Sequence, residues 1–135
     1  MLNNNLTMKK YNKVLVVDDT QIDRYIAERM LLKHQIASEV ICLDSAQLAL
    51  DYLIKCLDTS LPLPELILLD IRMPEMDGFE FLEAFNRLDN GIKDSCSIMM
   101  LSTSLDPEDH LKADNNPLVK KFLNKPLSKE IINTL

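Results

Sequence analysis

The sequence predicts an α/β protein in which five parallel strands form one doubly wound sheet with helices on both faces. Two runs, 14–17 and 66–69, are wholly aliphatic, and each ends on an aspartate. Such short apolar runs, bounded by polar residues, are typical of strands buried on both faces. Strand-like and helix-like segments alternate five times, and right-handed crossovers then place helices on both faces of a parallel sheet.

Each expected strand precedes a segment whose apolar residues recur at helical spacing. The strands are expected at 14–17, 39–43, 66–69, 97–101 and 118–123. The first helix begins at Thr20, and its expected buried face consists of Ile22, Tyr25, Ile26 and Met30. Asp44 and Gln47 have capping spacing for the second helix. Its expected buried stripe is Ala46, Ala49, Leu50, Leu53 and Leu57.

Capping signals also mark the three later helices. Their expected N-caps are Asp77 (with Glu80 at capping-box spacing), Asp106 (with proline next) and Ser128. The helix after Asp77 should bury Phe81, Leu82, Phe85 and Leu88. The chain should break at 90–91, and the last helix should be short, running from about 128 to 135.

Composition indicates one globular domain after a short polar leader. We expect residues 1–12, which are Asn-rich and aperiodic, to form a flexible leader, and residues 13–135 to form the domain. A net charge of -6 and a pI of about 4.8 argue against a nucleic-acid-binding surface, which needs a basic stripe. No apolar run in the sequence approaches the length of a membrane span, so we expect a cytoplasmic protein.

Polar residues follow four of the expected strands. Asp18 and Asp19 end the first strand, Asp70 the third, Ser102 the fourth and Lys125 the fifth. In a parallel sheet these ends share one edge, where open α/β sheets place their ligand sites. Crowded carboxylates repel one another unless a cation neutralises them, and oxygen ligands without His or Cys favour Mg²⁺. A carboxylate beside Mg²⁺ can attack phosphorus, while a lysine and a hydroxyl hold the phosphoryl oxygens.

Four pieces of the sequence resemble the receiver domain of two-component response regulators. They are Val16-Val17-Asp18-Asp19, the stretch from Leu68 to Pro74 with Met76-Asp77-Gly78, Met100-Leu101-Ser102, and Phe122 with Lys125-Pro126. The resemblance covers about residues 13–135 and implies a flavodoxin-like sheet of order 2-1-3-4-5. It also implies a single-domain phosphorylation switch. Such a switch takes its phosphoryl group from a histidine kinase or a histidine phosphotransfer protein, and a downstream protein reads its state.

The resemblance further implies a role for each matched residue. Asp70 would accept the phosphoryl group, and Asp19, Asp70 and the backbone carbonyl of Arg72 would ligate Mg²⁺. Asp18 would act on the metal mainly through a bound water. Lys125 would pair with the phosphoryl group, and its bond to Pro126 would be a cis peptide. The switch residues would be Ser102 and Phe122, the aromatic ring turning inward as the hydroxyl moves toward the phosphate.

Several positions depart from the pattern of the family or carry hypotheses of their own. Thr103 is larger than the residue that usually follows the switch hydroxyl, and the turn at 113–117 lacks the usual glycine. We expect the Arg72 side chain to reach over the mouth of the site and to pair with an acid such as Glu75. His34 and His110 are expected to be solvated helix residues.

Two other functions fit parts of the pattern less well. A phosphohydrolase of the haloacid dehalogenase type has a second aspartate two residues after its nucleophile, where this sequence has Arg72. A flavodoxin-like cofactor binder needs a Ser/Thr/Gly-rich phosphate loop, whereas Asp18 and Asp19 would repel a phosphate. We therefore expect a switch that catalyses only its own phosphorylation and dephosphorylation.

The last elements of the chain predict how the switch meets other proteins. The short final helix leaves little apolar surface after docking on the sheet. Lys120, Lys121 and Lys129 would place like charges near one another across a two-fold axis. We expect a monomer that stays monomeric when activated and offers this face to an acidic partner.

Overall fold

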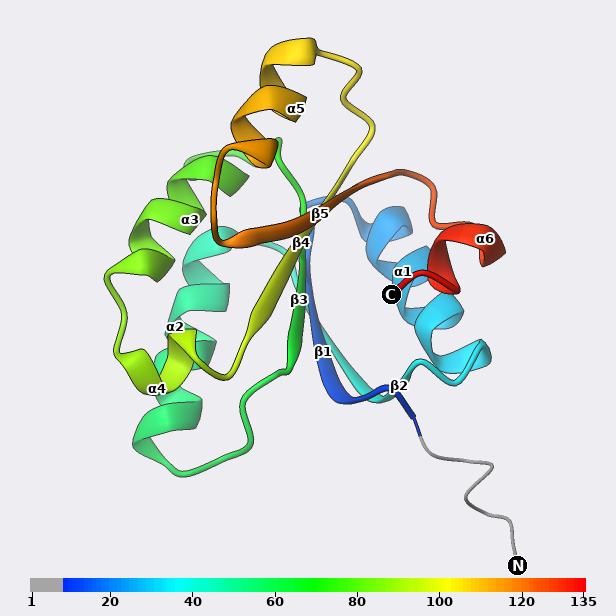
Figure 1. Cartoon of the computed structure of the whole chain (residues 1–135). Coiled ribbons are helices and arrows are strands. Elements are labelled where there is room, and N and C mark those ends of the chain that lie inside the picture. The colour runs from blue at the N-terminus through cyan, green and yellow to red at the C-terminus, as the bar shows by residue number, and fades with distance from the viewer. Residues whose placement is uncertain (1–8) are drawn as a thin grey trace, which may run out of the picture.

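The computed structural model describes residues 9–135, in which each of five strands is followed by a helix, and the third strand by two (Figure 1). The strands are β1 (Tyr11–Val17), β2 (Ala37–Leu43), β3 (Leu66–Leu69), β4 (Ser97–Ser102) and β5 (Val119–Asn124). The helices are α1 (Gln21–Lys33), α2 (Ala46–Asp58), α3 (Gly78–Asn86), α4 (Asn90–Lys93), α5 (Pro107–Asp114) and α6 (Lys129–Ile132). Residues 1–8 of the predicted leader lie outside the described residues. The first strand begins inside that leader, at Tyr11.

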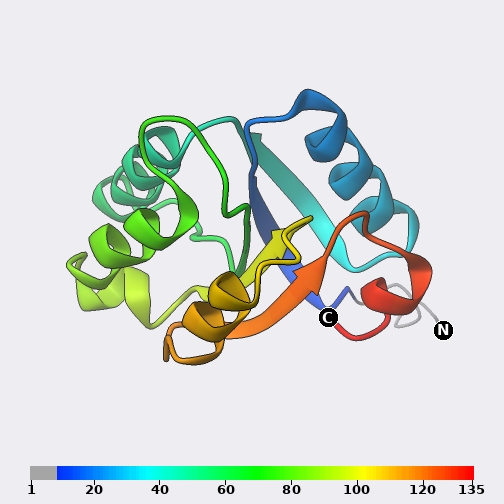
Figure 2. The same ribbon diagram turned by 90° about the horizontal axis from the view of Figure 1, so that it is seen from above.

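All four strand pairings are parallel, and the sheet has the order β2-β1-β3-β4-β5. The predicted fold class and strand order are therefore confirmed. Helices α1 and α6 cover one face of the sheet, and α2, α3 and α4 cover the other (Figures 1 and 2). Helix α5 packs along β5 and adds its Ala113 to the core on the α2–α3 side. Lys120 and Lys121 lie exposed on β5, an edge strand as predicted.

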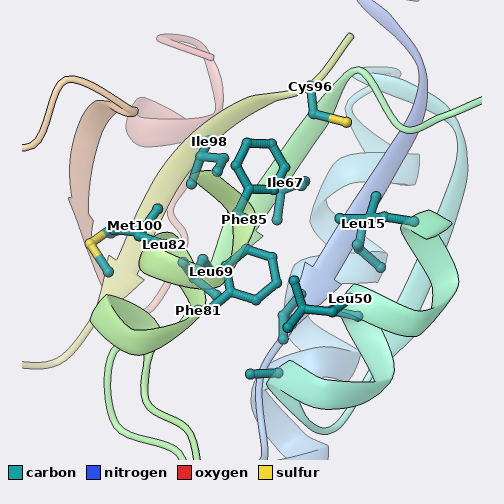
Figure 3. Close-up of a cluster of buried hydrophobic side chains, with 14 of the residues drawn as sticks. Leu15, Leu50, Ile67, Leu69, Phe81, Leu82, Phe85, Cys96, Ile98 and Met100 are labelled. Atoms are coloured by element: carbon teal, nitrogen blue, oxygen red, sulfur yellow. The ribbon is translucent and has the colours of Figure 1, made fainter. Parts of the chain in front are cut away.

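The larger core lies between the sheet and helices α2 and α3 (Figure 3). From the sheet, Leu15, Ile67 and Leu69 are fully buried, and from α3 the rings of Phe81 and Phe85 stack with centroids 6.0 Å apart. Alternate residues of the same strands point to the opposite face, because successive strand side chains alternate. There they form a second core with α1 and α6. Packing on both faces fixes the carboxyl ends of β1 and β3 in register, since Val17 pairs with Leu69.

Helix α1 is rotated from the predicted orientation. Its fully buried residues are Ala27 and Leu31, one turn apart, while the predicted Ile22 and Tyr25 are 59% and 55% exposed. The start of the helix explains the difference, because the Arg24 guanidinium donates to the carbonyl of Asp18 at 2.9 Å. This contact ties the first turn to the end of β1.

Three other helix boundaries also differ from the prediction. Ser45, not Asp44, caps α2, because its hydroxyl accepts from the Leu48 N–H at 3.1 Å. The predicted break at 90–91 is instead the short helix α4, which Asp89 caps. Helix α6 has only 4 residues and ends at Ile132, although Leu135 beyond it is still buried.

Candidate functional site

Three carboxylates meet at the carboxyl ends of β1 and β3. Figure 1 shows the loop to α5 leaving the same edge of the sheet. Asp18 and Asp19 follow β1, and Asp70 follows β3. Each side chain offers an oxygen, and these oxygens all lie within 4.8 Å of one another. Asp18 and Asp70 are buried, while Asp19 is exposed. The sequence correctly predicted that these acids form one cluster.

Lys125 faces this cluster from the end of β5. Its Nζ lies 2.6 Å from an Asp18 oxygen and 3.3 Å from an Asp70 oxygen, and its side chain is 8% exposed. The backbone supports it, because the Lys125 N–H donates to the Ser102 carbonyl at 2.9 Å. The peptide bond to Pro126 is cis, as the family resemblance implies.

A fourth carboxylate, which the sequence analysis missed, completes the surroundings of Lys125. The Asp23 side chain in the first turn of α1 accepts from the Lys125 Nζ at 2.9 Å. One sequence signal could have found it. Asp23 lies in the first turn of α1, and the start of the helix that follows β1 lies at the same edge of the sheet as the end of β1.

The loop after Asp70 closes tightly over the end of β3. The Gly78 N–H donates to the Ile71 carbonyl at 2.8 Å. A Cβ on Gly78 would stand 2.5 Å from the Asp70 carbonyl oxygen, so only glycine fits there. Asp77 and Glu80 then form the predicted capping box of α3, each side chain accepting from the other's backbone N–H. The loop therefore holds the backbone of Asp70 rigidly against the start of α3.

The charges of the site perturb one another. Burial, followed by the negative charge of Asp18, raises the pKa of Asp70 to about 6, although Lys125 opposes this rise. Burial alone would lower the pKa of Lys125. Hydrogen bonds to Asp18 and Asp23, together with the charge of Asp70, outweigh burial and raise that pKa above its usual value. The three crowded carboxylates are hard oxygen donors, which suit a divalent cation such as Mg²⁺.

The two predicted switch residues lie on the neighbouring strands β4 and β5. Ser102 is buried at the end of β4, and its hydroxyl accepts from the Ser104 N–H at 3.1 Å. Phe122 on β5 is half-buried, and its ring lies 4.0 Å from that of His110, centroid to centroid. The prediction that His110 is simply solvated is wrong. The His110 Nε2 also lies 3.1 Å from the Ser104 carbonyl.

Arg72 points to α5 rather than along its own loop. Its guanidinium pairs with Asp109, not with the predicted Glu75, whose backbone φ is 70°. Asp109 is only 4% exposed and also accepts from the Ser104 hydroxyl at 2.7 Å. The buried acid on α5 thus gives Arg72 a better-fixed partner than Glu75, which is exposed. The β3–α3 loop and the β4–α5 loop are therefore joined through one carboxylate.

The chain matches a family model, that of the response regulator receiver domain, over residues 14–135. The chain belongs to this family, whose members are receiver domains of two-component response regulators. It is therefore a domain of phosphorylation-dependent signalling.

Two proteins similar in sequence illustrate the family. A two-component response regulator from rice, ORR1, is 29% identical over 125 residues, which are 91% of this chain and 53% of that protein. A probable methanogenesis regulatory protein from Methanothrix harundinacea, FilR2, is 30% identical over 117 residues, or 87% of this chain and 74% of that protein. The chain thus spans about half the length of the rice relative.

Solved structures agree with the sequence relatives. A two-component response regulator from Cytophaga hutchinsonii has a TM-score of 0.85 and 27% identity, with 93% of this chain and 94% of that chain covered. The Mn²⁺-bound form of the response regulator Rcp1 has a TM-score of 0.73 and 26% identity, with coverage of 91% and 88%. Within residues 9–135, no helix has the length and apolar character that crossing a membrane requires.

Proposed function

We propose that this protein accepts a phosphoryl group on Asp70 from a phosphohistidine of a kinase or phosphotransfer protein. A downstream protein then reads the phosphorylated state, and the cytoplasm is the compartment proposed for both events. The observation that carries the proposal is the position of Asp70. It is a buried carboxylate that lies within 4.8 Å of two others and 3.3 Å from the ammonium of Lys125. The nucleophilic carboxylate therefore lies next to an ammonium that can neutralise the charge of a phosphoryl group.

In the proposed reaction, a carboxylate oxygen of Asp70 forms a bond to phosphorus while the phosphorus–nitrogen bond of phosphohistidine breaks. The imidazole nitrogen leaves with the electron pair of that bond and takes up a proton afterwards. Charge spreads over the phosphoryl oxygens during the transfer. The Lys125 side chain is only 8% exposed, so its ammonium would neutralise that charge in a setting with little water.

The donor set fits a divalent cation. Asp19, Asp70 and the backbone carbonyl of Arg72 would hold Mg²⁺ directly, and Asp18 would do so through a water molecule. The bound ion would neutralise the carboxylates and the phosphoryl oxygens. The similar response regulator Rcp1 has been solved with Mn²⁺, a cation that takes the same kind of oxygen ligand.

The switch that follows phosphorylation would start at Ser102. Its hydroxyl now accepts from the Ser104 N–H, and turning toward a phosphoryl oxygen on Asp70 would break this hydrogen bond. The β4–α5 loop would then shift, and Phe122 would turn inward. Because the Phe122 ring lies against His110, which belongs to α5, this movement of Phe122 would also shift α5. The face formed by α5 and β5 is thus the proposed output.

Labelling with a small phosphodonor tests the proposal. With acetyl phosphate and Mg²⁺, the protein should gain one phosphoryl group that hydroxylamine removes, and EDTA should prevent the gain. Asp70→Asn should abolish labelling. Asp58→Asn, which changes an exposed aspartate at the end of α2, is the matched control and should label normally. Full labelling in EDTA or in the Asp70→Asn variant would contradict the proposal.

A further inference from the structure

Lys125 is surrounded by three carboxylates, and one of them has no role in the proposed chemistry. A lysine ammonium has three N–H donors. The Lys125 Nζ has oxygens of Asp18, Asp23 and Asp70 at 2.6, 2.9 and 3.3 Å. Each donor therefore has one carboxylate partner. Asp23 is the unexplained partner, contributed by α1.

Asp23 differs from the other two partners of Lys125 in one respect. Asp18 and Asp70 belong to the acid cluster that suits a cation, and Asp23 is outside that cluster. A cation and a phosphoryl group that used the oxygens of Asp18 and Asp70 would weaken the hold of both residues on Lys125. Asp23 would keep its contact with Lys125, because it is not part of the candidate cation cluster found among the described residues.

The position of Asp23 relative to the site is well fixed. It lies in the first turn of α1, where the helix dipole stabilises a carboxylate. That turn is tied to Asp18 twice, through the Arg24 guanidinium and through the Thr20 N–H, which donates to an Asp18 oxygen at 2.9 Å. The Asp23 side chain in the Lys125 pair is 30% exposed. It can therefore hold Lys125 from the solvent side of the site.

We propose that Asp23 is a positioning residue that holds the Lys125 ammonium where it meets the phosphoryl oxygens on Asp70. The inference rests on the proposed function. A lysine side chain is a point charge on a flexible four-carbon stem, so an unanchored Lys125 loses conformational freedom at every transfer. If Asp23 keeps its contact after cation binding, the Lys125 ammonium is already in position before phosphoryl transfer begins. Charged groups that are positioned before the reaction lower its barrier most.

The first test observes Lys125 itself in the presence of saturating Mg²⁺ and beryllofluoride, the condition under which Asp23 is the proposed anchor. Side-chain ammonium protons held in hydrogen bonds exchange slowly with water, and NMR detects them on ¹⁵N-labelled lysine. Asp23→Ala should broaden or remove the Lys125 signal, while Asp23→Asn, which keeps an acceptor oxygen, should preserve it. An unchanged Lys125 signal in Asp23→Ala would overturn the inference, whatever the labelling experiments show.

The second test is kinetic. Labelling of Asp70 by acetyl phosphate at saturating Mg²⁺ should slow about tenfold in Asp23→Ala and by about twofold or less in Asp23→Asn. Glu28→Ala removes a carboxylate from the same helix, on the side near Cys42, and should label at the wild-type rate. Thermal unfolding of each variant checks that the fold is intact.

A double-mutant cycle separates positioning from a general structural effect. If Asp23 acts through Lys125, Asp23→Ala should have no further effect on labelling in a Lys125→Met background. An equal tenfold loss in both backgrounds would overturn the inference and leave the proposed function standing. Absence of labelling in the wild type would instead contradict the proposed function.

Discussion

Asp70 is a buried acid whose protonation should affect the stability of the metal-free protein. Burial and the charge of Asp18 raise its pKa to about 6, well above the unfolded value of 3.8. The folded state therefore binds the proton more tightly than the unfolded state. The stability that results is fully present below pH 3.8 and is lost as the pH rises through about 6.

Asp70→Asn should remove the free-energy cost of holding an ionised carboxylate at this buried position, which the wild type bears above about pH 6. In EDTA at pH 7.5, we expect the substitution to raise the free energy of unfolding by about 1–3 kcal/mol. At pH 4.5 the gain should be much smaller, because wild-type Asp70 is then largely protonated. Urea denaturation at the two pH values measures the difference. Equal gains at both pH values would show that ionisation of Asp70 is not the cause.

Gly78 is a second single residue on which the site depends. A Cβ there would contact the backbone of Asp70 and Ile71 at 2.5 and 3.0 Å, and backbone has little freedom to move. Gly78→Ala should therefore cost about 1–3 kcal/mol of stability and displace Asp70. The control is Gly91→Ala in α4, where the Cβ would meet only side chains, Asp89 and Leu57, at 3.1 and 3.2 Å. A smaller loss in Gly78→Ala than in Gly91→Ala, measured by denaturation, would contradict this reasoning.

At the scale of elements, the Arg72–Asp109 ion pair joins the loop after β3 to α5. The Asp109 side chain is 5% exposed, while that of Arg72 is 62% exposed. We expect Arg72→Ala to shorten the half-life of the phosphoryl group, because it opens a path for the hydrolytic water. A tenfold effect would correspond to about 1.4 kcal/mol of barrier.

A matched variant shows whether the pairing or the guanidinium itself matters. Asp109→Asn keeps Arg72 but weakens its hold on α5, so it should also shorten the half-life if the fixed position of Arg72 excludes water. The decay of the phosphorylated protein, followed by mass spectrometry, gives both half-lives. A half-life that stays the same or lengthens in Arg72→Ala would refute the shielding role.

The sequence predicted the starts of helices correctly where residues close together in the sequence set them. The capping box at Asp77 and the proline after Asp106 mark α3 and α5 correctly, because the groups that satisfy each helix start are neighbours in sequence. The prediction for the buried face of α1 was wrong at Ile22 and Tyr25, because a tertiary contact, Arg24 to the Asp18 carbonyl, sets the rotation of the helix. The predicted Met30 does pack against the core. Hydrophobic spacing alone favoured Ile22 and Tyr25, which are exposed.

The candidate site also has a part that could be predicted from the sequence and a part that could not. Its acids and Lys125 follow apolar strands, so a parallel sheet brings them to one edge, and their convergence could be predicted. Contacts that cross between helices and loops could not. Asp23 reaches Lys125 across 102 positions of sequence, and Asp109 reaches Arg72 across 37. Such pairs depend on how helices dock on the sheet, which no local pattern encodes.

For the whole molecule, we predict a monomer in both states. Helix α6 has 4 residues, and Ile132 at its end and Leu135 beyond it are already buried against the sheet. Exposed Lys120, Lys121 and Lys129 add like charges to the same region. Sedimentation with and without beryllofluoride and Mg²⁺ measures the oligomeric state. A tight dimer in the activated sample alone would contradict the proposal that this face binds a different, acidic partner.

The central claim is that Asp70, among 21 acidic residues, is the phosphoacceptor. Borohydride reduction tests it most directly, because it converts an aspartyl phosphate to homoserine, which peptide mass spectrometry then locates in the sequence. After treatment with phosphodonor and Mg²⁺, the account predicts homoserine at position 70, and unmodified aspartate there when EDTA is present. Homoserine at Asp18, Asp19 or Asp23 in place of position 70 would contradict the account.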